Sequence, residues 1–255
     1  MTRTPTTSEE ELAFLASYDA GRFPRPSVAV DVVLLTVRDA AVWALLGQRA
    51  EHPRRGRWAL PGTFVGMDEP LDSAATRVLQ TKVGLDDVFT EQLYTFGAPR
   101  RDPRTRVISV AYYALVEHGA LERAVVAHTD SDLALARLAV PWIGEAGGPV
   151  SAIAGEGDPL PLLLAFDHAD ILGMAVRRIR GKLDYAPIGF ELLPSAFSLR
   201  DLRLVHEAIL GRALNKDSFR RRMLDRGLVE PTGERAAGVG HRPPELYRFA
   251  DRSTT

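Results

Sequence analysis

Hydrophobic positions in the first half of the chain follow the pattern of β-strands. The run 27–37 (SVAVDVVLLTV) is β-branched and largely apolar, which is typical of a strand that is covered on both faces. Further strands are expected at 42–49, within 54–65, at 92–97 and at 107–116. A short acidic helix is expected to begin near Ser8. The pattern therefore predicts a sheet preceded by an amino-terminal helix.

A helical pattern interrupts these strands between residues 68 and 84. Apolar residues recur at helical spacing, at Leu71, Ala74, Ala75, Val78, Leu79 and Val83. Asp68 can cap this helix, Pro70 suits its first turn, and Gly84 can end it. The stretch therefore predicts one amphipathic helix packed on the sheet.

The composition changes after residue 142. Residues 142–160 (WIGEAGGPVSAIAGEGDPL) are rich in glycine, proline and small side chains, which is typical of a linker or lid loop. We place the domain boundary there and divide the chain into a first domain (1–150), a linker (151–165) and a second domain (166–255). Residues 118–135 are alanine-rich and charged, and no role follows from them.

Three helices are expected in the second domain. The first covers 166–183, with Asp167 as its cap and an apolar face opposite a basic side that carries Arg177, Arg178, Arg180 and Lys182. Helices at 199–210 and 216–226 follow, separated by a short turn that contains Gly211. Strands at 228–230 and 246–249 enclose a glycine-rich tip. This order of elements predicts a winged helix-turn-helix.

Composition excludes several classes of function. The chain has 255 residues, 45% of them apolar, a net charge of −1 and no cysteine, which excludes disulfides and thiolate metal sites. Six histidines show no metal-ligand spacing. The start of the chain has no apolar signal core, and no apolar run approaches the ~20 residues that span a bilayer, so we expect a cytoplasmic protein without a cofactor.

Charge is distributed unevenly along the chain. From Phe166 onward 16 Lys/Arg oppose 12 Asp/Glu, a net charge of +4, and the preceding residues carry a net charge of −5. A basic carboxyl-terminal part indicates a polyanionic partner.

The helix at 68–84 also carries a motif. Glu69, Arg77 and the pair Gly84-Leu85, which follow Gly62, have the spacing of the Nudix box, which this stretch resembles, and the flanking residues Trp58, Leu60 and Pro61 match as well. The resemblance implies an α+β protein whose first domain is a Nudix-type mixed-sheet α/β/α sandwich.

Three residues depart from the box. Val78, Thr81 and Lys82 stand where Nudix hydrolases have glutamates that hold divalent cations beside a pyrophosphate. An ammonium group cannot coordinate a cation, so we expect no catalytic residues, no metal and no enzymatic activity. The alternative is a Nudix-family hydrolase of ADP-ribose or a related nucleoside diphosphate derivative, whose divergent metal site would use Glu69, Asp68 and acidic residues outside the box.

An arginine-rich loop at 97–104 (GAPRRDPR) lies between two predicted strands. Guanidinium groups bind phosphate oxygens two at a time, and the segment resembles the loop beside the ligand in ADP-ribose-type Nudix proteins. The candidate ligand-binding residues are Arg49, Arg57, Phe64, Arg101, Asp102 and Arg104. Aromatic residues such as Phe64 and Phe96 more often pack in a core than stack on adenine. A competing interpretation is a structural module that only dimerises.

The third helix carries the candidate DNA-binding residues. Phe219 and Met223 share its buried side, so Arg221 projects opposite them toward base edges and phosphates. The candidates are Lys216, Ser218, Arg220, Arg221 and Arg222 on the helix and Arg235, His241 and Arg242 in the wing. Taken alone, a run such as 220–222 is more often a solvated face.

Taken together, these features resemble the Nudix-related transcriptional regulators of NAD metabolism over nearly the full chain. The segments that carry the resemblance are 23–26, 58–62, 95–97, 101–104, 166–168, 181–185, 190–194, 219–221, 230–233 and 246–249. The resemblance implies a homodimeric repressor that binds double-stranded palindromic operator DNA and senses an NAD-related metabolite, often ADP-ribose. Relatives of this architecture also sense sugars or sugar phosphates, so the effector stays open, as does the direction of its effect on DNA binding.

Overall fold

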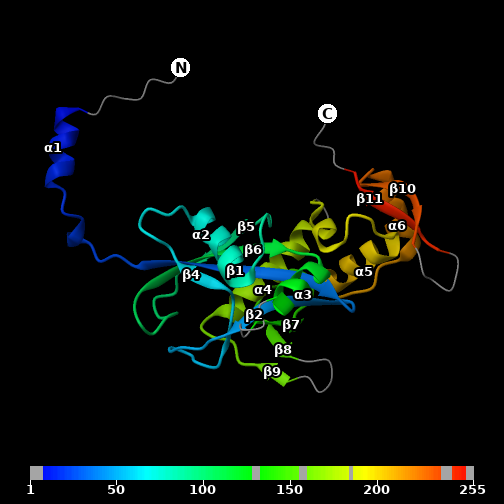
Figure 1. The fold of residues 1–255 in the computed structure, drawn as a ribbon, viewed down its shortest axis with the longest axis horizontal. Helices are drawn as coiled ribbons and strands as arrows, with labels where there is room; N and C mark the ends of the chain where they lie inside the picture. Colours follow the sequence, from blue (N-terminus) through cyan, green and yellow to red (C-terminus); the bar gives the residue numbers. More distant parts are fainter. Residues whose placement is uncertain (1–7, 128–132, 155–159, 184–185, 237–242, 251–255) are drawn as a thin grey trace.

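Strand β1 (Ser27–Arg38) lies at the centre of a mixed sheet in the computed structural model of the protein (Figure 1), which describes residues 8–127, 133–154, 160–183, 186–236 and 243–250. It runs parallel to β6 (Val107–Leu115), in a register that pairs Ser27 with Val107 and Leu35 with Leu115. It runs antiparallel to β2 (Ala41–Gln48) and to β4 (Gly62–Phe64). The strands predicted around residues 27–116 are thus confirmed.

The remaining strands extend this sheet on both sides. They are β3 (Trp58–Ala59), β5 (Glu91–Phe96), β7 (Leu133–Ala139), β8 (Ser151–Ala154) and β9 (Leu160–Leu162). Within the described residues the order is β5-β6-β1-β2-β7-β8-β9, with β3 paired to β2 and β4 paired to β1. The sheet is mixed because β1 and β6 are parallel while the other pairs are antiparallel.

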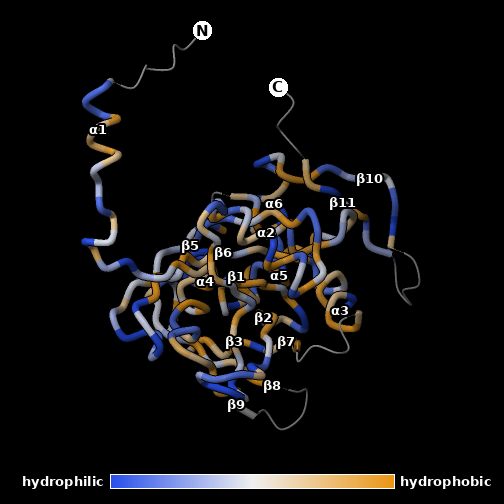
Figure 2. Tube along the Cα trace, turned by 60° about the vertical axis from the view of Figure 1, so that its left-hand side comes forward, coloured by the Kyte–Doolittle hydropathy of each residue, from blue (hydrophilic) through white to orange (hydrophobic). Residues whose placement is uncertain are grey.

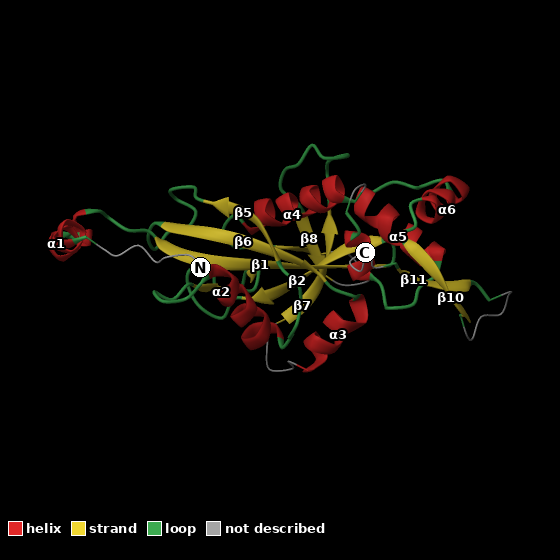
Figure 3. Cartoon of the chain, turned by 90° about the horizontal axis from the view of Figure 1, so that it is seen from above, coloured by secondary structure: helices red, strands yellow, loops and turns green. Residues whose placement is uncertain are grey.

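Side chains of β1 alternate between two apolar layers. Val32 and Leu34 pack in the cluster beneath α2 (Leu71–Val78) and α3 (His118–Ala127), whereas Val33 and Leu35 pack in the cluster beneath α4 (His168–Lys182). Successive residues of a strand point to opposite faces, so a strand covered on both sides must be apolar throughout. Figure 3 shows α4 on one side of the sheet and α2 and α3 on the other. The predicted α/β/α sandwich is confirmed.

The box helix begins after Pro70 and ends at Gly84, and its predicted N-cap needs correction. Pro70 is its N-cap residue and no side chain caps it, so the predicted cap by Asp68 is wrong because that residue lies two positions upstream of the cap. The helix continues in a π-helical turn, η2 (Leu79–Val83), and ends at Gly84 with φ 71°. Glycine accepts this left-handed conformation without strain.

The segment predicted as a linker contains strands. Residues 151–154 pair with β7, and 160–162 pair with 152–154 in turn. Helix α4 then packs on the sheet, where Ile171, Leu172 and Ile179 belong to the same cluster as Val33. Strands of three or four residues between glycines and prolines are too short for periodicity to reveal, which is why composition favoured a linker.

A winged helix follows the sandwich at one end of the molecule. It comprises α5 (Leu199–Leu210), α6 (Lys216–Asp225), β10 (Val229–Arg235) and β11 (Glu245–Phe249), preceded by η3 (Ile188–Leu192). Ser198 and Asp201 form a capping box on α5, Gly211 ends that helix with φ 67°, and the Asn215 side chain caps α6. A small core around Phe219, Met223 and Tyr247 joins these elements. The predicted helix-turn-helix and wing are confirmed.

Helix α5 belongs to two cores at once. Leu202 lies in the winged-helix core, while Val205 and Ile209 lie in the core beneath α4. Arg180, predicted on the basic side of α4 opposite its apolar face, is only 6% exposed and donates from Nε to the Ile209 carbonyl at 2.7 Å. Its Nη1 donates to the carbonyls of Trp142 and Gly144, and the guanidinium lies 4.7 Å from the Trp142 ring centroid. Burial lowers the pKa of Arg180.

Helix α1 (Glu9–Ser17) stands apart from the rest of the chain. It begins next to Ser8, as predicted, and the Ser8 side chain caps it. It has no buried residue, although Leu12, Phe14 and Leu15 are apolar. A 3₁₀ turn, η1 (Ala20–Arg22), connects it to the strands, and Figure 2 shows its apolar positions away from the body of the molecule. Within the described ranges, no helix combines the length and apolar character needed to cross a bilayer.

Replacing Arg180 by Met should lower the free energy of unfolding by about 1–3 kcal/mol, because the carbonyls of Ile209, Trp142 and Gly144 would lose a buried donor. Urea denaturation measures this change. The matched control is Arg177→Met, because Arg177 is an exposed arginine of the same helix. Equal effects of the two substitutions would contradict a structural role for the buried guanidinium.

Candidate functional site: a cationic cavity and a basic helix

A cavity of about 650 Å³ opens where the Nudix box meets the carboxyl end of β2 and the start of α4. The box contributes Gly62, Phe64, Thr81 and Lys82, and Arg49 follows β2. Asp31, Glu51, Arg101, Arg104, Phe166 and His168 also line the cavity. Drug-sized ligands bind in cavities of ~300–1,000 Å³, so the volume suits a nucleotide-sized ligand.

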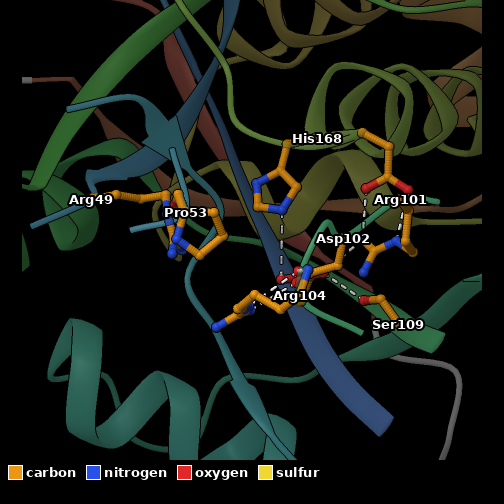
Figure 4. Close-up of polar contacts among 9 residues, drawn as sticks. Arg49, Pro53, Arg101, Asp102, Arg104, Ser109 and His168 are labelled. Carbon is orange, nitrogen blue, oxygen red and sulfur yellow. Dashed lines mark hydrogen bonds and ion pairs between the residues drawn. The ribbon is translucent and has the colours of Figure 1, made fainter. Parts of the chain in front are cut away.

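Arg101 is anchored inside the protein. Its side chain is 5% exposed and forms two hydrogen bonds with Asp167, from Nε at 2.8 Å and from Nη2 at 2.6 Å (Figure 4). Nη2 also lies 3.5 Å from Asp31. Burial lowers the pKa of Arg101, but the bonds to Asp167 outweigh it and the net shift is upward. Asp167 is the N-cap residue of α4, as predicted, but its side chain makes no capping bond because Arg101 occupies both carboxylate oxygens.

Asp31 is a carboxylate within the apolar run of β1 and is 8% exposed. Its Oδ2 accepts a hydrogen bond from the Ser109 hydroxyl, and Oδ1 faces Gly62. A Cβ at Gly62 would lie 2.3 Å from Oδ1, which no real contact allows. Position 62 is therefore required to be glycine by this close approach of Asp31.

His168 is buried between Asp31 and the box. Its Nδ1 accepts the Leu60 backbone N–H at 2.9 Å, so the proton of the neutral ring belongs on Nε2, which lies 3.9 Å from Asp31. Burial lowers the pKa of His168. Burial thus favours the neutral ring, and the Leu60 N–H occupies its Nδ1 lone pair.

Arg104 and Arg49 present cations over aromatic rings. Arg104 is held by Asp102 at 2.8 Å and lies 5.4 Å from the Phe64 ring centroid. Arg49 lies 5.0 Å from the Phe166 ring centroid, and its Nε donates to the Pro53 carbonyl at 2.8 Å. Burial and then the neighbouring Arg104 lower the pKa of Arg49. Arginine remains charged in proteins, so the cavity wall keeps these positive charges.

Lys82 reaches the cavity from the end of the box helix. Its ammonium donates to the Gly62 carbonyl oxygen. The residue is exposed overall, but the partial burial of its ammonium group lowers the pKa of Lys82. Asp31 opposes this shift, whereas Arg49 and Arg77 add to it. A cationic group therefore occupies the cavity side of the box.

Glu69 and Arg77 of the box form an ion pair with each other. Arg77 binds both oxygens of Glu69 at 2.7 Å, and the Gly66 N–H donates to Glu69 at 2.9 Å. Arg77 also donates to Thr63 and to the Phe64 carbonyl. These bonds fix the turn between β4 and α2, and they lower the pKa of Glu69 to about 2. The Glu69 carboxylate is thus occupied by Arg77 and does not face the cavity.

These residues do not fit the divalent cation that the Nudix fold implies. Within the ranges that the structure describes, no three His, Cys, Asp or Glu residues are grouped closely enough to hold a metal ion. Val78 is fully buried in the core, Thr81 donates to the Arg77 carbonyl, and Lys82 brings positive charge. Hard cations need several oxygen ligands, which these side chains do not supply.

The structure brings together most of the predicted ligand-binding residues. Arg49, Phe64, Arg101 and Arg104 line the cavity. Arg57 does not, because its guanidinium donates to the Leu164 carbonyl, and Asp102 is a buried partner of Arg104. Phe96, by contrast, packs against the core beneath α4.

Asp31 and Asp167 were missed as site residues by the sequence analysis. A charged residue in the middle of an apolar strand was a signal for Asp31.

The predicted DNA-binding residues of α6 lie on one exposed surface. Lys216, Ser218, Arg220, Arg221 and Arg222 are all exposed, while Phe219 and Met223 are buried. Arg220 donates to the Tyr247 hydroxyl at 3.4 Å, and Arg222 lies 5.6 Å from the Phe219 ring centroid. Arg221 makes no hydrogen bond or ion pair with the described part of the chain.

The wing adds one described candidate. Arg235 ends β10, is exposed and donates to the Pro243 carbonyl at 3.2 Å. The predicted contacts His241 and Arg242 lie outside the described residues.

Comparison with known proteins defines the class. The NUDIX domain profile matches residues 25–138, and the profile of the NrtR DNA-binding winged helix domain matches residues 189–249. The molecule is thus a Nudix domain joined to a winged helix of the NrtR type.

Relatives match over nearly the whole chain. The ADPR responsive transcriptional repressor NtrR of Acinetobacter baylyi is 36% identical over 94% of this chain and 88% of its own length. Shewanella oneidensis NrtR, solved with a 27mer DNA, has a TM-score of 0.70 and 30% identity over 88% of this chain and 93% of that one. A MutT/nudix family protein from Enterococcus faecalis has a TM-score of 0.73 and 26% identity over 94% of this chain and 93% of that one. The chain belongs to the NrtR family of transcriptional regulators.

The Glu69–Arg77 pair predicts an acid titration. A carboxyl carbon NMR titration should place the pKa of Glu69 at about 2, and Arg77→Ala should return it toward ~4.3. Because the folded pKa is the lower one, the pair stabilises the fold above the unfolded pKa and loses this contribution as the pH falls toward about 2. Arg106→Ala is the control, since Arg106 binds the Gly97 carbonyl. An unchanged Glu69 titration in Arg77→Ala would contradict the pairing.

Proposed function

We propose that this protein is an ADP-ribose-responsive repressor: its Nudix domain binds ADP-ribose or a related metabolite without hydrolysing it, and its winged helix binds a palindromic operator as part of a homodimer. The observation that carries the proposal is a cation-lined cavity at a box that lacks a metal site, in a chain that also presents an exposed basic helix. The Acinetobacter relative is named for its response to ADPR, and the Shewanella relative was solved with DNA.

The cavity chemistry supports a diphosphate-containing ligand. Arg49, Lys82 and Arg104 place positive charge around it, and phosphate oxygens are the anions that such groups bind best. Phe64 and Phe166 offer ring faces at the same wall for a base or a sugar, although each already lies beneath an arginine. Asp31 can accept hydrogen bonds from sugar hydroxyls.

The described residues of the cavity do not supply the groups that metal-dependent hydrolysis needs. The hydrolase alternative required Glu69 and Asp68 as metal ligands, but Glu69 is occupied by Arg77 and Gly66. Neutral His168 accepts a backbone N–H and has no free nitrogen lone pair to activate water. We infer that the domain has the Nudix scaffold and a ligand cavity but does not catalyse hydrolysis.

The domain division follows the packing. We propose an effector domain that includes α4 and ends near residue 183, and a winged helix that begins near residue 189. This division assigns 151–183 to the effector domain, because β8, β9 and α4 all belong to its sheet or pack on it.

A dimer is inferred from the requirements of DNA recognition. One winged helix contacts only a few base pairs, and a two-fold dimer doubles the site and requires half-sites about 34 Å or a multiple apart. A palindromic operator would then follow from the symmetry of the protein.

ADP-ribose should bind the protein, as measured by calorimetry, and should remain intact in magnesium and manganese. Replacing Arg104 by Ala should weaken binding by about 1.5–3 kcal/mol, because an exposed charged donor of the cavity is lost. Arg106→Ala is the matched control, since this arginine of the same loop does not line the cavity.

Turnover on the order of 1 per second would show an enzyme and overturn the non-catalytic part of the proposal. Failure of ADP-ribose, NAD, nicotinamide mononucleotide and sugar phosphates to bind would leave a structural, dimerising module.

Selection from a random DNA pool should enrich an inverted repeat. Arg221→Ala should cost roughly 1–3 kcal/mol and relax specificity at one position per half-site, whereas Arg235→Ala should weaken all sequences alike and reduce the salt slope by about one. The difference is expected because Arg221 projects from the exposed face of α6 and Arg235 lies in the wing. No enriched repeat, or unchanged binding when Arg220, Arg221 and Arg222 are all replaced by alanine, would exclude operator binding through this helix.

A further inference from the structure

The position of Lys82 suggests more than the loss of a metal ligand. Its ammonium group is held at the Gly62 carbonyl oxygen, on the wall of the cavity. Gly62 lies so close to Asp31 that a Cβ at this position would clash with the Asp31 carboxylate. A positive charge is therefore fixed by the box itself, at the place where the box meets the ligand cavity.

Lys82 does not act alone in the cavity. Arg49 and Arg104 line the same cavity, together with the carboxylates of Asp31 and Glu51. Burial lowers the pKa of Lys82, Asp31 raises it, and Arg49 and Arg77 lower it. Arg104 in turn lowers the pKa of Arg49. An anion bound between Lys82, Arg49 and Arg104 would be attracted by all three cations.

The ammonium has the right chemistry for this task. It carries three N–H donors, and the Gly62 carbonyl takes one of them. The remaining donors can bind phosphate oxygens, as lysine does in many phosphate sites. A divalent cation would otherwise supply this charge, but it would be repelled by Lys82, and the described residues offer no group of three His, Cys, Asp or Glu side chains to hold it.

We propose that Lys82 is a built-in cation that binds the diphosphate of the effector directly, so that the protein recognises its ligand without a divalent metal. This inference rests on the proposed function and assigns the diphosphate to Lys82, Arg49 and Arg104. Lys82 is a specificity residue: it selects ligands that carry a diphosphate, and it makes affinity independent of magnesium.

Calorimetry with the full chain, in EDTA and in magnesium, tests whether Lys82 binds the diphosphate without a divalent metal. Wild-type protein should bind ADP-ribose equally in both. Lys82→Met, which keeps the apolar stem and removes the charge, should bind about ten- to a hundredfold more weakly in both, as expected for one charge-assisted bond. Arg177→Met is the control, because Arg177 is an exposed cation that does not line the cavity. Lys82→Gln provides a second neutral variant if Lys82→Met fails to fold.

A second probe separates this inference from the proposed function. Inorganic pyrophosphate should bind wild-type protein in EDTA and lose at least tenfold in affinity in Lys82→Met, since it carries only the anion. Equal affinity of wild type and both neutral variants for ADP-ribose, or a wild type that binds only with magnesium, would overturn the role of Lys82. Lys82-dependent binding of pyrophosphate without binding of ADP-ribose would support the cationic site and reject the proposed effector.

Discussion

The buried ion pair between Arg101 and Asp167 is the contact on which the arrangement of the molecule depends most. It connects the loop after β5 to the first turn of α4 across 66 positions of sequence, with both bonds shorter than 3 Å. A carboxylate and a guanidinium removed from water are stable only when each finds its partner with good geometry. This requirement positions α4 over the sheet and sets Arg101 beside Asp31, so the wall of the cavity and the cover of the sheet are fixed by the same pair.

Helix α4 carries this constraint to the winged helix. Its first turn holds Arg101 through Asp167, and its last turn holds α5 through Arg180 and the Ile209 carbonyl. Helix α5 shares one core with α4 and another with α6. The cavity and the DNA-binding surface are therefore connected through packed helices, and close-packed cores respond to strain by discrete shifts.

Local patterns in the sequence were sufficient for most elements but not for the site. Strand β1, helices α2, α5 and α6 and the wing followed from periodicity, caps and glycines, because these signals act within a few residues. Asp167 was predicted correctly as the N-cap residue, but its bond to Arg101 was missed because that partner is distant in sequence. The burial of Arg180 against the Ile209 carbonyl was missed for the same reason. The cavity residues Arg49, Phe64, Arg101 and Arg104 were predicted from the sequence. Asp31 was not, because only the folded chain brings it beside Arg101.

The way the box has changed shows which of its residues serve the scaffold. Gly62 admits Asp31, Glu69 and Arg77 close the turn before α2, and Gly84 ends the helix in a left-handed conformation. Each of these roles is structural, so each residue is needed whether or not a metal is held. Val78 has meanwhile become part of the apolar core, where a glutamate would bury an unpaired carboxylate. Valine at position 78 therefore stabilises the packing beneath α2. Lysine at position 82 instead places a charge at the ligand cavity. The two residues that replace box glutamates thus have different physical roles, one in packing and one in electrostatics.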